Sequence, residues 1–575
     1  MNKLAKAAGV ITALMIAGYT ADAQQDKTSK SADVPKGWHL LDKTKDGYYG
    51  ISLDKAYEFF KSKNLKSKTV LVAVIDSGID TLHEDLKDVL WVNTKEIPGN
   101  GIDDDGNGYI DDIHGWNFIG GKDGRNVKQD SYEGARVYHT LKVKYANKEI
   151  DTTTLSPEEK DEYKTWLKAK KKVEGDGESE DGQVDLVMLK RALNMAQKSD
   201  SILRTALNKD TYTGNDIDTF NAVTTSEKSA RASLLYLFRT NQMMETTNKE
   251  FLEGFGEFVS GEERKAEAKE KAPPDYRGEI TGDNEADIND RFYGNADVMA
   301  STPFHGTHVA GIIGASRNNG KGMDGIADNV KIMMIRAVPD GDEHDKDVAL
   351  AIRYAVDNGA KVVNMSFGKD FSPQKHWVDE AVKYAESKGV LLVHAAGNDA
   401  KNIDSADNFP NAYAKGTNQK FSNWITVGAS GDPKAGGLTA SFSNYGKDQV
   451  DVFAPGVKIY STIPGGTTYG NAQGTSMASP VVAGTAALLL EYFPYLTPQQ
   501  VKYCLEKSVQ VPDIKVRKPG TADSVMLSDL SQSGGIINAY EAAKIAATLN
   551  PENKGDAPKP QKKSKKKPSM RNKKD

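Results

Sequence analysis

The stretch VLVAVID, residues 70–76, decides the fold. A continuous apolar and β-branched run of this length is typical of a strand that is buried on both faces of a parallel sheet. Four more runs of this kind follow along the chain, at residues 330–335, 362–365, 390–393 and 424–427. Helical patterns lie between them, at residues 347–357 and 377–387. The alternation predicts an α/β fold with a doubly wound, mostly parallel sheet flanked by helices.

Three short motifs place polar residues where such a sheet holds its functional groups. Asp76 ends the first apolar run, and ligands of open α/β sheets bind at the carboxyl ends of strands. His305 begins the motif HGTHVAG and Ser476 lies in GTSMASP, and each opens a helical pattern. A serine hydroxyl is a weak nucleophile that needs an adjacent base, and a carboxylate orients that base. Each residue alone could be structural, as a turn residue, a buried histidine or a helix N-cap, but the three together predict a catalytic triad.

In the order Asp, His, Ser, these motifs resemble those of the subtilisin-like serine proteases, or subtilases. The resemblance covers roughly residues 47–118 and 281–545. It implies a subtilisin-like fold and a secreted serine endopeptidase that hydrolyses peptide bonds of polypeptide substrates through an acyl-enzyme. Asp76 would orient His305, and His305 would act as general base and then general acid for Ser476. Unlike in most relatives, Asp76 and His305 lie 229 positions apart.

The resemblance also implies residues that bind the substrate and the developing oxyanion. The Asn398 side-chain amide and the Ser476 backbone N–H would form the oxyanion hole. Six residues would bind the peptide substrate and shape the first specificity pocket: Ser366, Phe367, Gly368, Ala395, Ala396 and Gly397. Lys369 stands where many relatives have a further glycine, so substrate preference on this side is expected to differ.

The stretch NGIDDDGNGYIDD, residues 100–112, is a candidate calcium loop. Hard cations prefer several oxygen ligands on one tight loop with glycine at its turns. The predicted ligands are Asp103, Asp105, Asn107, the Tyr109 carbonyl, Asp111 and Asp112. The spacing is similar to that of an EF-hand, but His114 stands where an EF-hand has its bidentate glutamate. The alternative is an Asp/Gly turn without an ion, and no organic cofactor is indicated.

Residues 121–280 account for most of the long gap between Asp76 and His305. Ser156 and Glu159 form a capping-box pattern with proline at the first helical position, and leucines recur at helical spacing within residues 186–207. The pattern predicts an inserted helical subdomain at the rim of the active site. It could be a stabilising appendage, or a lid that limits access and makes the protease selective.

The ends of the chain predict export. Residues 1–23 carry two lysines, an apolar run and an Ala-Asp-Ala site, a pattern typical of a signal peptide. We therefore expect an extracellular, periplasmic or cell-surface protein. The predicted division is a signal peptide (1–23), an N-terminal arm (24–46), a discontinuous peptidase domain (47–120 and 281–548), the helical insertion (121–280) and a basic disordered tail (549–575).

Positive charge is concentrated in the tail. Its last 25 residues hold nine lysines, one arginine and three acidic residues, whereas the whole chain has a formal net charge of −5. The tail could make electrostatic contact with the cell envelope or be a solvated extension. The acidic remainder and the export signal argue against nucleic acid as a partner. An envelope binding or adhesion protein on a subtilase scaffold, with secondary or no proteolysis, is the alternative function.

Overall fold

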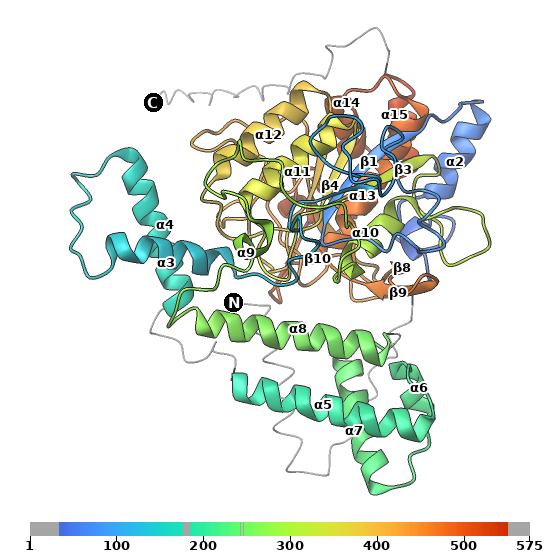
Figure 1. Ribbon diagram of the computed structural model, residues 1–575. Coiled ribbons are helices and arrows are strands. Elements are labelled where there is room, and N and C mark those ends of the chain that lie inside the picture. Colours follow the sequence, from blue (N-terminus) through green and yellow to red (C-terminus); the bar gives the residue numbers. More distant parts are fainter. Residues whose placement is uncertain (1–33, 176–184, 242, 245, 550–575) are drawn as a thin grey trace, which may run out of the picture.

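The computed structural model describes residues 34–175, 185–241, 243–244 and 246–549, shown in Figure 1. The predicted signal peptide and all of the predicted tail except Leu549 lie outside the described residues. A seven-stranded, all-parallel sheet has the strand order β2-β3-β1-β4-β5-β6-β7. The strands are β1 (Val70–Asp76), β2 (Gly115–Asn117), β3 (Val330–Arg336), β4 (Val362–Met365), β5 (Leu391–Ala395), β6 (Trp424–Ser430) and β7 (Val452–Pro455). The predicted α/β class is therefore confirmed.

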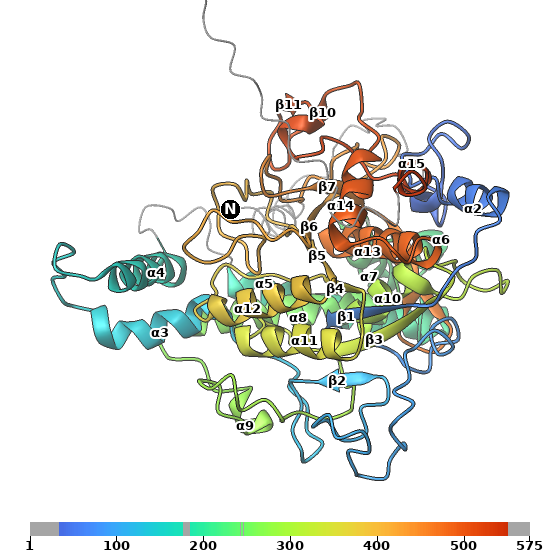
Figure 2. The ribbon, with the colours of Figure 1, turned by 90° about the horizontal axis from the view of Figure 1, so that it is seen from above.

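Strand β1 shows why this sheet is buried on both faces. Val70, Val72 and Val74 join one hydrophobic cluster, whereas Ala73 and Ile75 join a second cluster, as the two-residue period of a strand requires. Helices α2 (Leu53–Ser62), α10 (Phe304–Gly314), α13 (Thr475–Tyr492), α14 (Pro498–Lys507) and α15 (Ala539–Ala546) cover the first face. Helices α11 (Asp345–Asp357) and α12 (Lys375–Ser387) cover the second face, and Figure 2 shows the two layers.

The predicted strands and helices of the body are present with small shifts at their ends. Strand β6 runs three residues further than predicted, and α11 and α12 each begin two residues earlier. Strands β2 and β7 were not predicted, since β2 is only three residues long and the short run of β7 ends in a proline. Two antiparallel hairpins complete the body: β8 (Ile459–Ile463) with β9 (Thr468–Ala472), and β10 (Val516–Arg517) with β11 (Ser524–Val525).

The sequence patterns at residues 156–159 and 186–207 predicted helices in the insertion, and the described residues between β2 and α10 contain seven helices. They are α3 (Glu133–Tyr145), α4 (Pro157–Glu174), α5 (Leu186–Leu207), α6 (Gly214–Thr219), α7 (Thr225–Thr240), α8 (Asn248–Glu267) and α9 (Gly278–Thr281). The capping box at Ser156 is present, since the Glu159 N–H donates to Ser156 Oγ and the Ser156 N–H donates to the Glu159 carboxylate. In Figure 1, α3 and α4 lie beside the body, and α5 to α8 lie beneath it. The division of the chain into domains stays a prediction.

None of the helices within the described residues is long and apolar enough to cross a membrane.

Cys504 on α14 is fully buried in the first hydrophobic cluster, which agrees with a structural cysteine, and burial raises the pKa of its thiol to about 12.

Candidate active site

Asp76 and His305 meet at the carboxyl end of β1. Both carboxylate oxygens of Asp76 lie close to His305 Nδ1, at 2.8 and 2.9 Å. The Ser77 backbone N–H also donates to Asp76, at 2.7 Å. Because a carboxylate only accepts hydrogen bonds, Nδ1 carries the ring proton and Nε2 keeps its lone pair. The Asp76 side chain is buried, whereas that of His305 is 37% exposed, so this lone pair can reach a reacting group.

Two glycines make the Asp76–His305 contact possible. A Cβ on Gly306 would lie 2.2 Å from the Gly78 carbonyl oxygen and 3.2 Å from Asp76 Cβ. A Cβ on Gly78 would lie 2.7 Å from the Met299 carbonyl oxygen, and its φ of +137° favours glycine. The glycine at 306 therefore lets the start of α10 approach the end of β1, and the glycine at 78 does the same for the segment before α10.

The environment of His305 adjusts its basicity. Desolvation acts to lower its pKa, but the charge of Asp76 and its hydrogen bond together outweigh that effect. The pKa of His305 therefore lies above its ordinary value. His308, one helical turn further, differs, because burial lowers its pKa to about 3 and its Nε2 donates to the Ile459 carbonyl at 3.0 Å. His308 is thus a buried, hydrogen-bonded neighbour of His305.

Ser476 is the second residue of α13 and its hydroxyl points toward β4. Ser476 Oγ donates to the Ser366 carbonyl oxygen at 3.0 Å, and Ser366 Oγ donates to the Ser476 carbonyl at 2.9 Å. No hydrogen bond in the described part of the chain joins Ser476 to His305. Two members of the predicted triad are therefore hydrogen-bonded together, and the third is hydrogen-bonded to Ser366 instead.

Buried polar residues that sequence reasoning missed fix the start of α13 against β4. Asn364 Nδ2 donates to Ser366 Oγ at 2.9 Å, and Asn364 Oδ1 accepts from Ser479 Oγ at 2.8 Å. Both Asn364 and Ser479 are fully buried. An asparagine within the apolar run of β4 was the one signal in the sequence that could have indicated this contact.

Asn398 lies where it can present its amide N–H groups to an oxyanion. Its Oδ1 accepts from the Thr475 N–H at 2.8 Å and from the Thr475 hydroxyl at 2.9 Å, so Nδ2 points away from Thr475. A Cβ on Gly474 would lie 3.5 Å from both Asn398 Nδ2 and the Ser476 backbone nitrogen. The two predicted oxyanion donors therefore border one space, which glycine at position 474 leaves open.

The predicted substrate-binding residues follow two neighbouring strands. Ser366, Phe367 and Gly368 come directly after β4. Ala395 ends β5, and Ala396 and Gly397 follow it. Because β4 and β5 are parallel neighbours, the two segments leave the sheet at the same edge, next to the end of β1. The structure thus brings all six together beside the candidate triad, although Ser366, Ala395 and Ala396 are themselves buried.

The acidic loop contains a compact group of oxygens that differs from the predicted set. Glu96, Asp103 and Asp105 each have a carboxylate oxygen within 4.8 Å of the other two. Glu96 precedes the loop. It was missed because the predicted ligands were chosen by their spacing from Asp103, and Glu96 lies outside that spacing. Its two oxygens accept from the Asp105 N–H at 3.0 Å and the Asp111 N–H at 3.1 Å, which closes the loop onto Glu96.

The other predicted calcium ligands have protein partners in the structure. Asp111 accepts from the backbone N–H groups of residues 99, 100 and 101. Asp112 is fully buried and accepts from the Tyr354 hydroxyl at 2.5 Å. Asn107 Oδ1 accepts from the Tyr109 N–H at 2.7 Å, which shapes the turn between them. These four residues order the loop in the structure, and their role as ligands stays a prediction.

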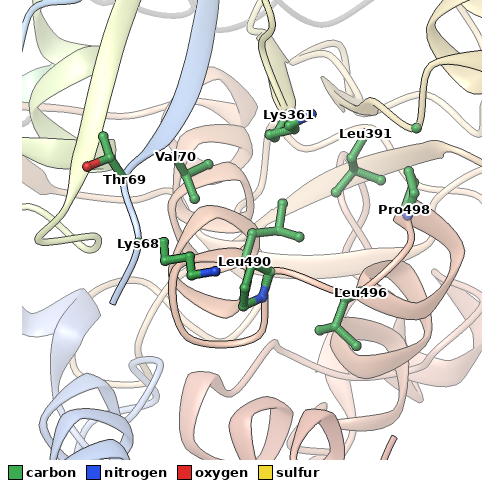
Figure 3. A pocket seen from close by; sticks show the side chains of 10 residues that line it. Lys68, Thr69, Val70, Lys361, Leu391, Leu490, Leu496 and Pro498 are labelled. Carbon is green, nitrogen blue, oxygen red and sulfur yellow. The ribbon is translucent and has the colours of Figure 1, made fainter. Parts of the chain in front are cut away.

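A cavity of about 230 Å³ lies at the opposite edge of the sheet, shown in Figure 3. Val70 and Leu391, at the amino ends of β1 and β5, line it together with Leu490 and Leu496. Asp76 lies at the other end of β1, and a strand of this length spans about 20 Å. This cavity is therefore no part of the candidate active site.

Comparisons with known proteins agree on one family. The profile described as "Subtilase family" matches residues 67–533. The "Thermophilic serine proteinase" of Bacillus sp. (strain AK1) is 46% identical over 32% of this chain and 42% of its own length. "Thermitase" of Thermoactinomyces vulgaris is 35% identical over 47% of this chain and 84% of its own length. The "Cell wall-associated protease" of Bacillus subtilis (strain 168) is 37% identical over 40% of this chain and 24% of its own length. The chain thus matches less than half the length of two of these three relatives.

Proposed function

Because the chain belongs to the subtilase family and is a subtilisin-like serine endopeptidase, we propose that Asp76, His305 and Ser476 form its catalytic triad. The observation that carries the proposal is the contact of both Asp76 oxygens with His305 Nδ1, at 2.8 and 2.9 Å. It leaves His305 Nε2 as an exposed base at the edge of the sheet where α13 presents Ser476.

The first half of the reaction forms an acyl-enzyme. The Ser476 hydroxyl turns from the Ser366 carbonyl to His305 Nε2, which removes its proton as Oγ attacks the carbonyl carbon of the scissile bond. Asp76 stabilises the imidazolium that forms. His305 then gives the proton to the leaving amine as the C–N bond breaks. In the second half, His305 takes a proton from water as the water oxygen attacks the acyl carbon, and it then gives this proton to Ser476 Oγ as the bond between Oγ and the acyl carbon breaks.

The oxyanion of each tetrahedral intermediate would lie between Asn398 Nδ2 and the Ser476 N–H. The space that Gly474 leaves open adjoins both donors, and the helix N-terminus favours negative charge there. The main chain of an extended peptide would pair with residues 366–368. Residues 395–397 would contact the side chain of the substrate residue that precedes the scissile bond. Substrates are therefore polypeptides with an accessible extended segment.

Labelling with a serine-directed reagent tests the triad. Phenylmethanesulfonyl fluoride should modify Ser476 in the native protein, and the Ser476→Ala variant should lose peptide hydrolysis by roughly 10⁶-fold. The melting temperature of the variant should stay close to that of the native protein, because the hydroxyl makes a single hydrogen bond to Ser366. Unmodified Ser476, or a variant that still cleaves peptides, would remove the proposal.

We also propose that calcium binds the acidic loop through Glu96, Asp103 and Asp105, with the other predicted oxygen donors completing the set. The three carboxylates lie close enough to share one ion, and oxygen ligands of this kind fit a hard cation. Bound calcium would neutralise the repulsion among the carboxylates and tie residue 96 to residues 103–105. Its contribution would be to stability, since the loop is not among the residues assigned to the reaction.

Calcium titration by calorimetry on chelator-treated protein tests this site. Heat of binding and a higher melting temperature are expected for the native chain. Asp103→Asn should weaken both effects, whereas Asp123→Asn, an exposed carboxylate that pairs with Arg125, serves as the control. No heat for the native chain, or equal binding by Asp103→Asn, would contradict the assignment.

Export to the cell surface or beyond is the last part of the proposal. It is supported by the signal-peptide pattern of residues 1–23 and by a relative that is named as cell wall-associated. Contact of the basic tail with anionic envelope polymers would retain the protein there. Fractionation of cells that express the full chain and a form lacking residues 551–575 would test it, since the shortened form should be found more in the medium.

A further inference from the structure

We propose that Lys369 is a positioning residue for peptide substrates, held between the body and Glu133 of helix α3 of the insertion. The inference rests on the proposed function, because it concerns residues 366–368, which that function assigns to substrate binding. Lys369 follows this segment directly.

Lys369 is fixed at both its main chain and its side chain. Its N–H and carbonyl form two hydrogen bonds with the main chain of Phe409, both 2.9 Å. Its side chain is 1% exposed, and Nζ lies 2.8 Å from Glu133 Oε2 and 2.9 Å from Asp345 Oδ1. Nζ also donates to the Glu343 carbonyl oxygen at 2.6 Å. A lysine in a solvated loop would make none of these contacts.

Glu133 brings the insertion into this arrangement. It is the first residue of α3, and its carboxylate also pairs with Arg136 at 2.8 Å. Burial acts to raise the pKa of Glu133, but Arg136 and Lys369 outweigh it and hold the pKa well below its ordinary value. The Glu133 N–H donates to Asp342 at 2.9 Å, so the start of α3 is tied to the body by its main chain as well.

The next two residues of the body are held by the same pair of helices. Lys168 of α4 donates to the Asp370 carbonyl at 2.6 Å, and Lys172 forms an ion pair with the Asp370 carboxylate. Phe371 is buried in a hydrophobic cluster whose other members come from α3 and α4, Tyr138 and Trp166 among them. Three successive residues, 369 to 371, therefore contact the insertion by charge, by hydrogen bond and by apolar packing.

These contacts determine where the preceding segment lies. Buried ion pairs add little net stability, but they impose strict distances. A displacement of α3 and α4 would therefore move residues 369–371, and residues 366–368 with them. A substrate that extends several residues before the scissile bond pairs with this segment, whereas a single-residue ester reacts mainly with Ser476 and His305. Lys369 should therefore affect long substrates and leave short ones unchanged, because a misplacement of about 1 Å can reduce a rate by about 10²-fold.

The test compares the full-length native chain with its Lys369→Met variant on two substrates with the same residue before the cleaved bond. One is an N-acylated single-residue ester, and the other is a peptide with four residues before the bond. For Lys369→Met we expect a roughly 10- to 100-fold loss of kcat/KM on the peptide and less than about 3-fold on the ester. The rate at which phenylmethanesulfonyl fluoride labels Ser476 should be unchanged.

Further variants keep the test decisive if Lys369→Met folds poorly. Lys369→Arg keeps the charge and should restore most of the preference for the long peptide. Glu133→Gln removes the charged partner that the insertion supplies to Lys369, and this variant should lose part of the preference for the long peptide. The matched control is Lys502→Met on α14, where Nζ lies 2.6 Å from the buried Asp451 and away from the substrate segment. This control should lose stability and keep the native ratio of the two substrates.

The outcomes separate the inference from the proposed function. Equal losses on ester and peptide, or a native ratio in Lys369→Met and Glu133→Gln, would overturn the role of Lys369 while the protease assignment stands. A native chain whose Ser476 is not labelled and which cleaves neither substrate would overturn the proposed function itself.

Discussion

The two halves of the insertion are held by different forces. Helices α3 and α4 share their hydrophobic cluster with Phe371 of the body, and they form a buried ion pair with Lys369 and a partly exposed one with Asp370. Helices α5 to α8 instead share a cluster among themselves, whose ten buried members all lie between residues 196 and 251. Helix α8 connects them to the rest of the chain, because Arg264 pairs with Asp340 at 2.9 Å and Lys265 lies over the ring of Tyr132 at the start of α3.

The difference indicates that the insertion is two energetic units. Helices α3 and α4 depend on the body for part of their packing and pairing, because Phe371, Lys369 and Asp370 belong to it. Helices α5 to α8 bury their apolar side chains on their own and can vary while the active site stays intact. A role in substrate binding therefore belongs to the first unit, and the two could be distinguished by matched substitutions.

The largest effect is expected for Trp166→Ala in α4. Trp166 is buried, stacks on Tyr138 with 5.3 Å between ring centroids and packs in the cluster that holds Phe371. The substitution should lower the free energy of unfolding by about 3–5 kcal/mol, because it leaves a large cavity. Activity on long peptides should fall with it. Denaturant unfolding and peptide kinetics on one preparation would check both, and full activity would contradict the assignment of α4 to the substrate-binding region.

Phe238→Ala in α7 is the counterpart in the other half. Phe238 is fully buried and lies 4.7 Å from Phe251 between ring centroids. The substitution should again lower the free energy of unfolding by about 3–5 kcal/mol, but this loss should be confined to α5–α8. The rate of peptide hydrolysis should stay within about 3-fold of that of the native chain. Hydrogen exchange should speed up in α5–α8 and remain slow in α3 and α4. Loss of activity equal to that of Trp166→Ala would show that the insertion is one unit.

The comparison also explains which features the sequence could predict. Strand β1, the motifs around Asp76, His305 and Ser476, and the helices of the insertion follow from patterns of neighbouring residues. The Glu133–Lys369 pair joins positions 236 apart. The sequence around a charged residue does not indicate whether that residue has a buried partner elsewhere in the chain. Glu96 was missed because it lies outside the Asp/Gly spacing of the loop, and the contact between Asn364 and Ser479 was missed because it joins positions 115 apart. The Ser476 hydroxyl bonds to Ser366 because a rotatable O–H takes the nearest acceptor, a choice that depends on the packing of α13 against β4.

A smaller effect, with a defined pH dependence, is expected for Asp370→Asn. Burial acts to raise the pKa of Asp370, but Lys172 and Lys401 outweigh it and lower the pKa to about 2. The Asp370 carboxylate therefore stabilises the fold fully above the pKa that it has in the unfolded chain, roughly 4. This stabilisation is lost as the pH falls through the folded-state pKa of about 2. At neutral pH the variant should be about 1–2 kcal/mol less stable than the native chain, and the difference should vanish near pH 2. A pH-independent difference would show that packing, and not charge, holds α4 against residue 370.

The smallest effect is expected for Lys190→Ala, within the second half. Lys190 of α5 pairs with Glu263 of α8 at the surface, with side chains 55% and 33% exposed. An exposed pair of this kind contributes about 0–1 kcal/mol, and high salt should remove most of it. A double-mutant cycle with Glu263→Gln would isolate the pair from the loss of the lysine stem. Because both residues belong to α5–α8, neither substitution should alter the ratio of long to short substrates. A changed ratio would mean that the second half transmits force to the active site through α8 and Asp340, and the two-unit description would then have to be abandoned.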